Sequence, residues 1–308
     1  MKSPIGILKT FRIGNLLIIA LLEFILHRSI ISSALYKSGI SPALSEANLG
    51  ILIVFSMFLT WSGYLINDIY DYDIDRINKS GFSQVDYFGG KNGSWKAYVI
   101  LSLFCLLLAI YLSVTLGKWN YFWLLPLAML TLWLYSSKLK NHFFLGNIGV
   151  SVLVCLVILL VWLSENTQIG LISDISVKVR LSGIFLLYAA FAFLTTWARE
   201  LVKDAQDLEG DRHNNLQTFP ARYGTKPTMH YLIILLSGLL TMMCLVFYIN
   251  IGIFSNFQIL FAIFFLILPV LLVMGLAVKA WRKSDFGRMS FLLKLTMLAG
   301  IIFLLTLP

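Results

Sequence analysis

Residues 48–75 read NLGILIVFSMFLTWSGYLINDIYDYDID. The apolar part of this stretch is long enough to cross a bilayer as one helix, and it ends in the acidic pattern NDxxDxxxD. Residues three and four apart share one side of a helix, so Asp68, Asp71 and Asp75 lie within roughly 60° of one another. Asp73 points to the opposite side. The stretch therefore predicts a membrane helix that ends in a row of carboxylates.

A second stretch, KDAQDLEGD at residues 203–211, repeats the DxxDxxxD spacing at the end of another apolar run. Together the two clusters hold eight of the 15 acidic residues of the chain, namely Asp68, Asp71, Asp73, Asp75, Asp204, Asp207, Glu209 and Asp211. Stacked like charges repel unless cations lie between them, and hard oxygen ligands suit Mg²⁺ that bridges to a phosphate-bearing substrate. The repeat also points to two related halves around a shared cavity, on the evidence of the clusters alone.

The composition places most of the chain in a membrane. Hydrophobic residues make up 59% of the sequence, charged residues only 13%, and the mean hydropathy is +0.84. Nine apolar runs are long enough to span, near residues 13–33, 48–67, 97–116, 119–136, 144–163, 181–199, 229–249, 257–279 and 289–306. The weakest are the fourth, which holds Pro126, and the ninth, where we expect Lys294 to reach the nearby interface. We therefore predict an all-α, polytopic membrane protein with one domain over residues 1–308.

The basic residues predict the orientation of these spans. With the N-terminus inside, 18 Lys and Arg residues fall in inside segments and five in outside segments. Positive charge collects on the cytoplasmic side of membrane proteins, so we expect a cytoplasmic N-terminus, an outside C-terminus and both acidic clusters at the cytoplasmic face. The net charge of +9 is then explained by attraction to membrane lipids, and we expect no nucleic-acid partner.

Basic residues also lie near the acidic clusters. Arg199, Lys203, Arg212, Arg222 and Lys226 surround the second cluster, and further lysines follow the fourth span. Metal-binding carboxylates beside Arg and Lys are typical of a diphosphate site. Because the site opens into an apolar bundle, a diphosphate with an apolar tail fits it best. Solvated helix ends are the simpler alternative, but the matched pair of clusters makes that explanation weak.

These motifs resemble the UbiA superfamily of intramembrane prenyltransferases over essentially the whole chain. The family pattern has NDxxDxxxD after the second of nine helices and DxxDxxxD after the sixth. Further similar pieces are Arg12 and Asn15 in FRIGN, Tyr135-Ser136 followed by Lys140 and Gly146-Asn147, Arg199-Glu200-x-x-Lys203-Asp204, and the tail GDRHNNLQTFPARYG from Gly210 to Gly224. The chain departs from the family at Ser80, where Pro is expected, and at Asn214-Asn215, where Gly is common. Those changes put the acceptor in doubt.

The resemblance implies nine helices around a central cavity and a Mg²⁺-dependent transfer of an isoprenyl group from a polyprenyl diphosphate to a hydrophobic or amphiphilic acceptor. By the resemblance, the metal-binding residues are Asp68, Asp71, Asp75, Asp204, Asp207 and Asp211. Catalytic contacts to the diphosphate are assigned to Lys140, Arg199 and Lys203. Substrate-binding roles are assigned to Asn15, Asn67 and Asn147. The developing carbocation is shielded from water inside the bundle.

The sequence does not decide which acceptor receives the isoprenyl group. The tract RELVKDAQDLEGDR is most similar to branches that use lipid-like acceptors such as geranylgeranylglyceryl phosphate, and aromatic quinone precursors are nearly as consistent with it. A membrane terpene cyclase on the same scaffold is an alternative. A cation-coupled transporter is less consistent with the sequence, because its acids belong near the bilayer midplane and only Glu23 lies there.

Two further features invite a function. The segment Gly81–Ser94 follows the first cluster and is rich in glycine, so it is either a lid that brings Lys91 to the diphosphate or a plain solvated connection. Glu23 lies inside the first span. It has a functional role or forms a structural pair with His27 or Arg28.

Overall fold

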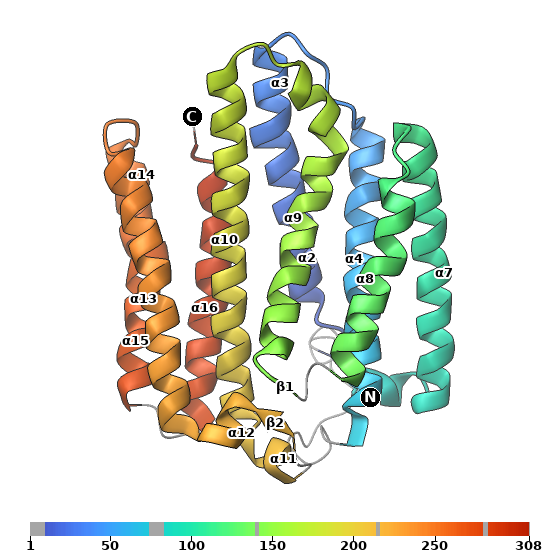
Figure 1. The fold of residues 1–308 in the computed structure, drawn as a ribbon, viewed down its shortest axis with the longest axis vertical. Helices are drawn as coiled ribbons and strands as arrows, with labels where there is room; N and C mark the ends of the chain where they lie inside the picture. Colours follow the sequence, from blue (N-terminus) through green and yellow to red (C-terminus); the bar gives the residue numbers. More distant parts are fainter. Residues whose placement is uncertain (1–9, 74–82, 139–141, 214–215, 280–282, 308) are drawn as a thin grey trace. The chain divides into compact units, whose positions relative to one another are not determined.

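The computed structural model describes residues 10–73, 83–138, 142–213, 216–279 and 283–307. These residues are almost entirely helical and group into two compact units (Figure 1). Unit 1 comprises residues 1–139 and 156–185, and unit 2 comprises residues 140–155 and 186–308. The prediction of an all-α protein is confirmed, and the prediction of a single domain stays a prediction.

The elements follow one another along the chain as a series of long helices with short connections. In order they are α2 (Ile13–Ile25), the π-helical η1 (Leu26–Ser32), α3 (Ser33–Lys37), α4 (Glu46–Tyr70), α6 (Gln84–Tyr87), α7 (Lys91–Leu116), α8 (Asn120–Ser137), β1 (His142–Phe143), α9 (Leu145–Leu171), α10 (Ile175–Gln206), α11 (Leu208–His213), β2 (Gln217–Thr218), α12 (Phe219–Tyr223), α13 (Thr225–Ile249), α14 (Asn256–Ala262), the π-helical η3 (Ile263–Ile267), α15 (Leu268–Lys279) and α16 (Lys283–Leu304).

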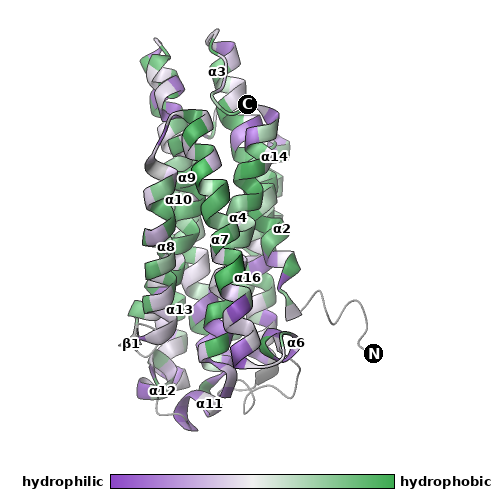
Figure 2. Cartoon of the chain, turned by 90° about the vertical axis from the view of Figure 1, so that its right-hand side faces the viewer, coloured by the Kyte–Doolittle hydropathy of each residue, from purple (hydrophilic) through white to green (hydrophobic). Residues whose placement is uncertain are grey.

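Eight helices among the described residues are long and apolar enough to cross a membrane, with α2, η1 and α3 forming one continuous span. The helix at residues 121–137, where the fourth run was predicted, is apolar but shorter. Hydrophobic residues dominate the middle of the long helices, and polar residues gather toward α6, α11 and α12 (Figure 2). The protein is thus a multi-pass integral membrane protein. The count of nine spans and the orientation stay predictions.

Unit 1 is held by close packing around α4, which carries the first acidic cluster. Gly63 lies against α8 so closely that an added Cβ would sit 2.7 Å from a methyl carbon of Leu132. At the cluster end of α4, Leu65 and Ile69 are buried together with Val85 of α6 and Leu101 of α7. This packing fixes the end of α4, and with it the direction of the acidic side chains.

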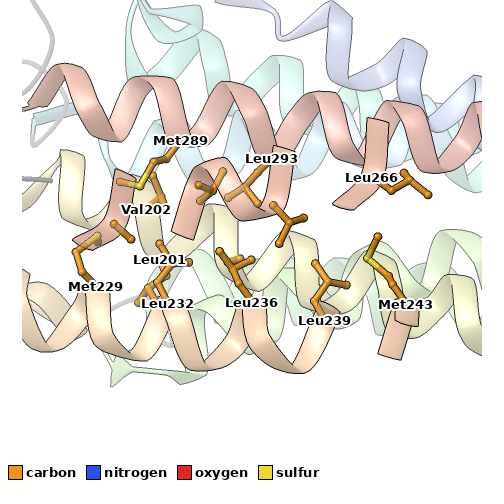
Figure 3. Packing of buried hydrophobic residues seen from close by; sticks show 14 of the residues in the cluster. Leu201, Val202, Met229, Leu232, Leu236, Leu239, Met243, Leu266, Met289 and Leu293 are labelled. Atoms are coloured by element: carbon orange, nitrogen blue, oxygen red, sulfur yellow. The ribbon is translucent and has the colours of Figure 1, made fainter. Parts of the chain in front are cut away.

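Unit 2 has its own apolar core between α10, α13, α15 and α16 (Figure 3). Leu201 of α10, Leu232 of α13 and Leu293 of α16 are fully buried in it. The two-residue strands β1 and β2 pair in parallel, with His142 opposite Gln217 and Phe143 opposite Thr218. The pair joins the segment before α9 to the segment after α11, so both lie beside the end of α10 that bears the second cluster.

The start of α10 is capped by Asp174, which lies outside the spans. The Ser176 hydroxyl and backbone N–H both donate to Asp174 Oδ1, at 2.7 and 2.8 Å. These hydrogen bonds favour the carboxylate and lower the pKa of Asp174 below its usual value. The helix therefore begins at a well-defined residue 30 or so positions before its acidic end.

The expected partners of Glu23 are corrected by the structure. Glu23 is fully buried and accepts a hydrogen bond from Ser56 of α4, at 2.6 Å. His27 instead contacts Glu165 of α9, with 2.9 Å between Nε2 and Oε1, and Arg28 pairs with Glu46 at the surface. Both predicted pairs, with His27 and with Arg28, are wrong. The π-helical turn η1 begins between Glu23 and His27, so a regular helical spacing of four does not apply.

We expect Glu165 to be the main polar clamp of unit 1. Besides His27, its carboxylate accepts from the backbone N–H groups of Ala43 and Leu44, at 2.8 and 2.9 Å. Glu165→Ala leaves these three donors without their acceptor and should lower the free energy of unfolding by about 3–5 kcal/mol. Thermal unfolding in detergent measures the change. Glu46→Gln, which breaks only an exposed pair, serves as control and should cost less than about 1 kcal/mol. Equal unfolding temperatures for the two variants would contradict the clamp.

Candidate active site

The first acidic cluster lies where α4 ends in unit 1. Asp68 and Asp71 are buried, with 7% and 5% of their surface exposed, and Asp71 forms the C-cap of the helix. Asp73 is exposed and pairs with Lys91 at 2.8 Å. The expected contrast between the two sides of the helix is therefore present. Asp75 lies outside the described residues, so its position stays a prediction.

Both carboxylate oxygens of Asp68 accept hydrogen bonds from other side chains. Oδ1 accepts from the Arg12 guanidinium at 2.5 Å, and Oδ2 accepts from the side-chain amide of Gln84 at 3.0 Å. Gln84 is itself fully buried, and its Oε1 accepts from the indole N–H of Trp61 at 2.9 Å. This chain of hydrogen bonds leaves the Asp68 carboxylate little freedom to rotate, as a pre-organised ligand or anion site requires.

Arg12 reaches Asp68 from a strained backbone. It precedes α2 with a φ of 53°, which for a residue with a side chain costs roughly 1–2 kcal/mol. Its guanidinium also lies over the ring of Tyr64, 4.6 Å from the centroid, and Asn15 donates to the Tyr64 hydroxyl at 3.3 Å. The contacts to Asp68 and Tyr64 offset the strain, so Arg12 and Asn15 both belong to the same end of the unit as the acidic cluster.

The residues at the end of α4 fit a hard divalent cation. Asn67 donates through Nδ2 to Asp71 at 2.7 Å, while its Oδ1 is buried and has no hydrogen-bond partner among the described residues. A buried oxygen with unused lone pairs beside a carboxylate is what Mg²⁺ coordinates in proteins. The described residues bring no three His, Cys, Asp or Glu side chains close enough to hold a metal by themselves. In unit 1 the third carboxylate of the motif, Asp75, lies outside those residues.

The second cluster lies at the end of α10 in unit 2. Asp204 accepts from the side-chain amide of Asn147 at 3.0 Å. Asp211 is buried in α11, and its Oδ2 accepts from the hydroxyl of Thr218 at 2.9 Å. Asp207 joins the two helices, because its N–H bonds the carbonyl of Lys203 and its own carbonyl accepts from the N–H of Asp211. The structure thus brings Asn147 together with the second cluster, and its substrate-binding role stays a prediction.

The basic residues that were predicted to contact the diphosphate lie on different elements. Arg199 and Lys203 both contact Glu200 on α10, the first at 3.5 Å. Lys91 lies at the start of α7 beside Asp73, with its amine 5.8 Å from the ring centre of Tyr72. Lys140 lies outside the described residues. The roles of Lys140, Arg199, Lys203 and Lys91 at the diphosphate stay predictions.

The predicted lid is anchored in its described part. Ser83 and Asp86 form a reciprocal capping box at the start of α6, and the Tyr72 hydroxyl donates to Asp86 at 2.7 Å. Gln84 and Val85 are fully buried. Residues 83–94 therefore pack as a structured support of the cluster. A hinged movement of this part would have to break the hydrogen bond from Gln84 to Asp68.

Gln84 is the site residue that the sequence did not reveal. A glutamine in a polar loop carries no pattern that distinguishes it from a solvated side chain. The capping box at Ser83 and Asp86 was the only available signal, since it predicts a helical turn and fixes which way the next residue points. Arg12 was visible only through the resemblance to a family.

A profile of the UbiA prenyltransferase family matches residues 29–298. The chain belongs to this family. Digeranylgeranylglyceryl phosphate synthase of Methanosphaera stadtmanae is 31% identical over 266 residues, which cover 83% of this chain and 86% of that protein. The protein is therefore a membrane-embedded transferase, a prenyltransferase, which leaves the transporter hypothesis without support.

Two solved structures share the fold. A structure described as digeranylgeranylglyceryl phosphate synthase in membranes superposes with a TM-score of 0.62 and 23% identity, covering 97% of this chain and 98% of that one. The apo structure of a UbiA homologue from Aeropyrum pernix superposes with a TM-score of 0.61 and 17% identity, covering 93% and 94%. The likeness extends over the full set of helices, so the UbiA fold of the chain is established by its backbone as well as by its motifs.

We predict that Asp71→Ala and Asp207→Ala each reduce prenyl transfer by at least about 100-fold, because each removes a carboxylate from the cation site. Asp73→Ala, in which only the exposed pair with Lys91 is lost, should stay within about threefold of the parent. Initial rates in detergent or nanodiscs, with unfolding temperatures as a folding check, measure the three variants. If Asp73 proves as sensitive as Asp71, the assignment of one helical face to the metal is wrong.

Proposed function

We propose that this prenyltransferase moves an isoprenyl group from a polyprenyl diphosphate to the hydroxyl of a geranylgeranylglyceryl-phosphate-type lipid, with Mg²⁺ as cofactor. The observation that carries the proposal is the 31% identity over 83% of the chain with a digeranylgeranylglyceryl phosphate synthase. The buried carboxylates of Asp68 and Asp71 at the end of α4 and of Asp211 in α11 support the diphosphate half of the reaction. Both substrates are amphiphiles that dissolve in membrane lipids.

The reaction needs few groups from the protein. The C1–O bond of the donor breaks and its electron pair leaves with the diphosphate. The acceptor oxygen then forms the new C1–O bond and its proton is lost to solvent. Bound Mg²⁺ would neutralise the charge that develops on the leaving diphosphate. Asn67, Asp68, Asp71 and Asp75 in unit 1 are the residues that would hold the cation there.

The second cluster makes the corresponding contribution in unit 2, through Asp204, Asp207 and Asp211. The side chains of Lys140 and Lys203 supply positive charge to phosphate oxygens of the donor, and positioned charges of this kind stabilise the transition state without reorganising. The apolar helices exclude water, so the allylic cation reacts with the acceptor rather than being hydrolysed. In this proposal the site faces the cytoplasm, on the side where the basic loops lie.

Removal of divalent metal should abolish transfer. We expect no product from geranylgeranyl diphosphate and geranylgeranylglyceryl phosphate after exhaustive EDTA treatment, and recovery on addition of Mg²⁺, because the carboxylates otherwise repel the diphosphate. A panel that includes an aromatic quinone precursor and a reaction without acceptor identifies the acceptor class. Prenylation of the aromatic compound alone would reject the lipid acceptor, a cyclic product without acceptor would indicate a cyclase, and undiminished turnover in EDTA would reject the metal.

The orientation is testable with single cysteines in a background without Cys105, Cys155 and Cys244. Tyr87→Cys, an exposed position in α6, should resist a membrane-impermeant maleimide in intact spheroplasts, because the site end lies in the cytoplasm. Gly252→Cys, in the exposed connection after α13, should be labelled. Both should react after the membrane is opened with detergent. The reverse pattern would overturn the cytoplasmic location of the site.

A further inference from the structure

Lys294 lies in an unexpected position for a positive charge. It is half-buried and about midway along α16, which begins at Lys283, rather than near the end of a span as the sequence indicated. The rise of a helix places it roughly 16 Å from the start of α16. Placing an ammonium group at such a depth costs free energy, and charged side chains in spans are retained where they have a function.

Close contacts between α16 and α10 place Lys294 beside the part of α10 that precedes its acidic end. The Tyr188 hydroxyl donates to the carbonyl of Gly300 at 2.8 Å, and a Cβ at Gly300 would lie 2.5 Å from the ring of Phe191. The two helices run in opposite directions (Figure 1). Lys294 is six residues before Gly300, so it lies about level with Thr196 of α10. Lys294 is accordingly within electrostatic range of Arg199.

Two hydrogen-bond donors on this part of α10 have no acceptor among the described residues. Arg199 Nε and Thr196 Oγ1 are buried and have no hydrogen-bond partner among the described residues, and residues three apart face the same side of α10. Within the part of the chain that the structure describes, the anionic contact of Arg199 is the long 3.5 Å approach to its neighbour Glu200. A buried guanidinium N–H without an acceptor is costly, unless a ligand supplies the acceptor.

We propose that Arg199, Lys294 and Thr196 bind the phosphate monoester of the acceptor lipid. This inference rests on the proposed function, which gives the acceptor a phosphate, and it assigns Arg199 to that phosphate in place of the diphosphate contact that the resemblance implied. A phosphate group supplies the acceptor oxygens that Arg199 Nε and Thr196 Oγ1 lack among the described residues, together with the negative charge that two neighbouring cations in a span attract.

The depth of the cluster favours the acceptor over the donor. Arg199 lies five residues before Asp204, which puts it roughly 7 Å further into the span than the acidic end of α10. The diphosphate of the donor binds at that acidic end, and its C1 atom points inward. The attacking hydroxyl must approach C1 from the inner side, and in a glyceryl phosphate the phosphate is only a few bonds from that hydroxyl. A phosphate held by Arg199 and Lys294 therefore orients the glycerol hydroxyl toward C1.

The test compares geranylgeranylglyceryl phosphate with geranylgeranylglycerol, which lacks the phosphate. Wild-type protein should prefer the phosphorylated acceptor in kcat/KM. In Lys294→Met and in Arg199→Gln this preference should fall by about 10–100-fold, the range of one or two charge-assisted hydrogen bonds. The loss should appear in the KM of the acceptor, while the KM of geranylgeranyl diphosphate changes less than about twofold. Lys294→Arg should restore most of the preference.

The controls separate this role from a structural one. Lys279→Met, in the exposed last turn of α15, removes a cation of unit 2 without touching the cluster and should keep the wild-type preference. Lys294→Met should unfold at the wild-type temperature or above, because it relieves a buried charge, whereas a structural lysine would lower it. An unchanged preference, or an increase in the donor KM instead, overturns the inference. Wild-type protein that uses neither glyceryl acceptor overturns the proposed function and the inference together.

Discussion

The need to satisfy every buried charge inside an apolar bundle governs this structure. A carboxylate in a membrane helix is tolerated only where donors or cations surround it. Glu165 meets this condition with His27 and two backbone N–H groups, and Asp68 meets it with Arg12 and Gln84. The first arrangement attaches the connection between α3 and α4 to α9. The second holds the Asp68 carboxylate in one orientation. The same physical requirement thus gives rigidity at one end of unit 1 and a prepared site at the other.

The two acidic clusters satisfy the requirement in different ways, although their spacing is the same. At the end of α4 a strained arginine and a buried glutamine hold Asp68. In the second cluster the amide of Asn147 donates to Asp204 and the hydroxyl of Thr218 donates to Asp211. A cation that binds at the first cluster must therefore share Asp68 with Arg12. At the second cluster it meets carboxylates that are oriented by an amide and a hydroxyl.

Much of the fold was predictable because hydrophobic length and acidic spacing are local signals. Each of the nine predicted runs coincides with a helix, and the burial of Asp68 and Asp71 opposite exposed Asp73 follows from helical periodicity alone. The errors arose where a local rule was broken. A π-helical turn changed the partners of Glu23, and the start of α16 at Lys283 left Lys294 deeper than its run implied. Contacts between distant segments, such as that of Gln84 with Asp68, have no local signature.

Among the described residues, the buried polar atoms without a partner include acceptor oxygens in unit 1, Asn67 Oδ1 and Glu23 Oε2, and N–H groups in unit 2, on Arg199 and Trp197. Hydroxyls, which can both donate and accept, are without a partner in both units, on Ser136 and Ser137 in unit 1 and on Thr196 in unit 2. Unused lone pairs attract a cation and unused N–H groups attract an anion. Since each unsatisfied group costs free energy in the ligand-free protein, a metal ion at Asn67 and a phosphate at Arg199 would both stabilise the fold as they bind. The polarity of these two positions is what the proposed transfer needs, because its substrates would carry phosphates and its leaving group would depart on a metal.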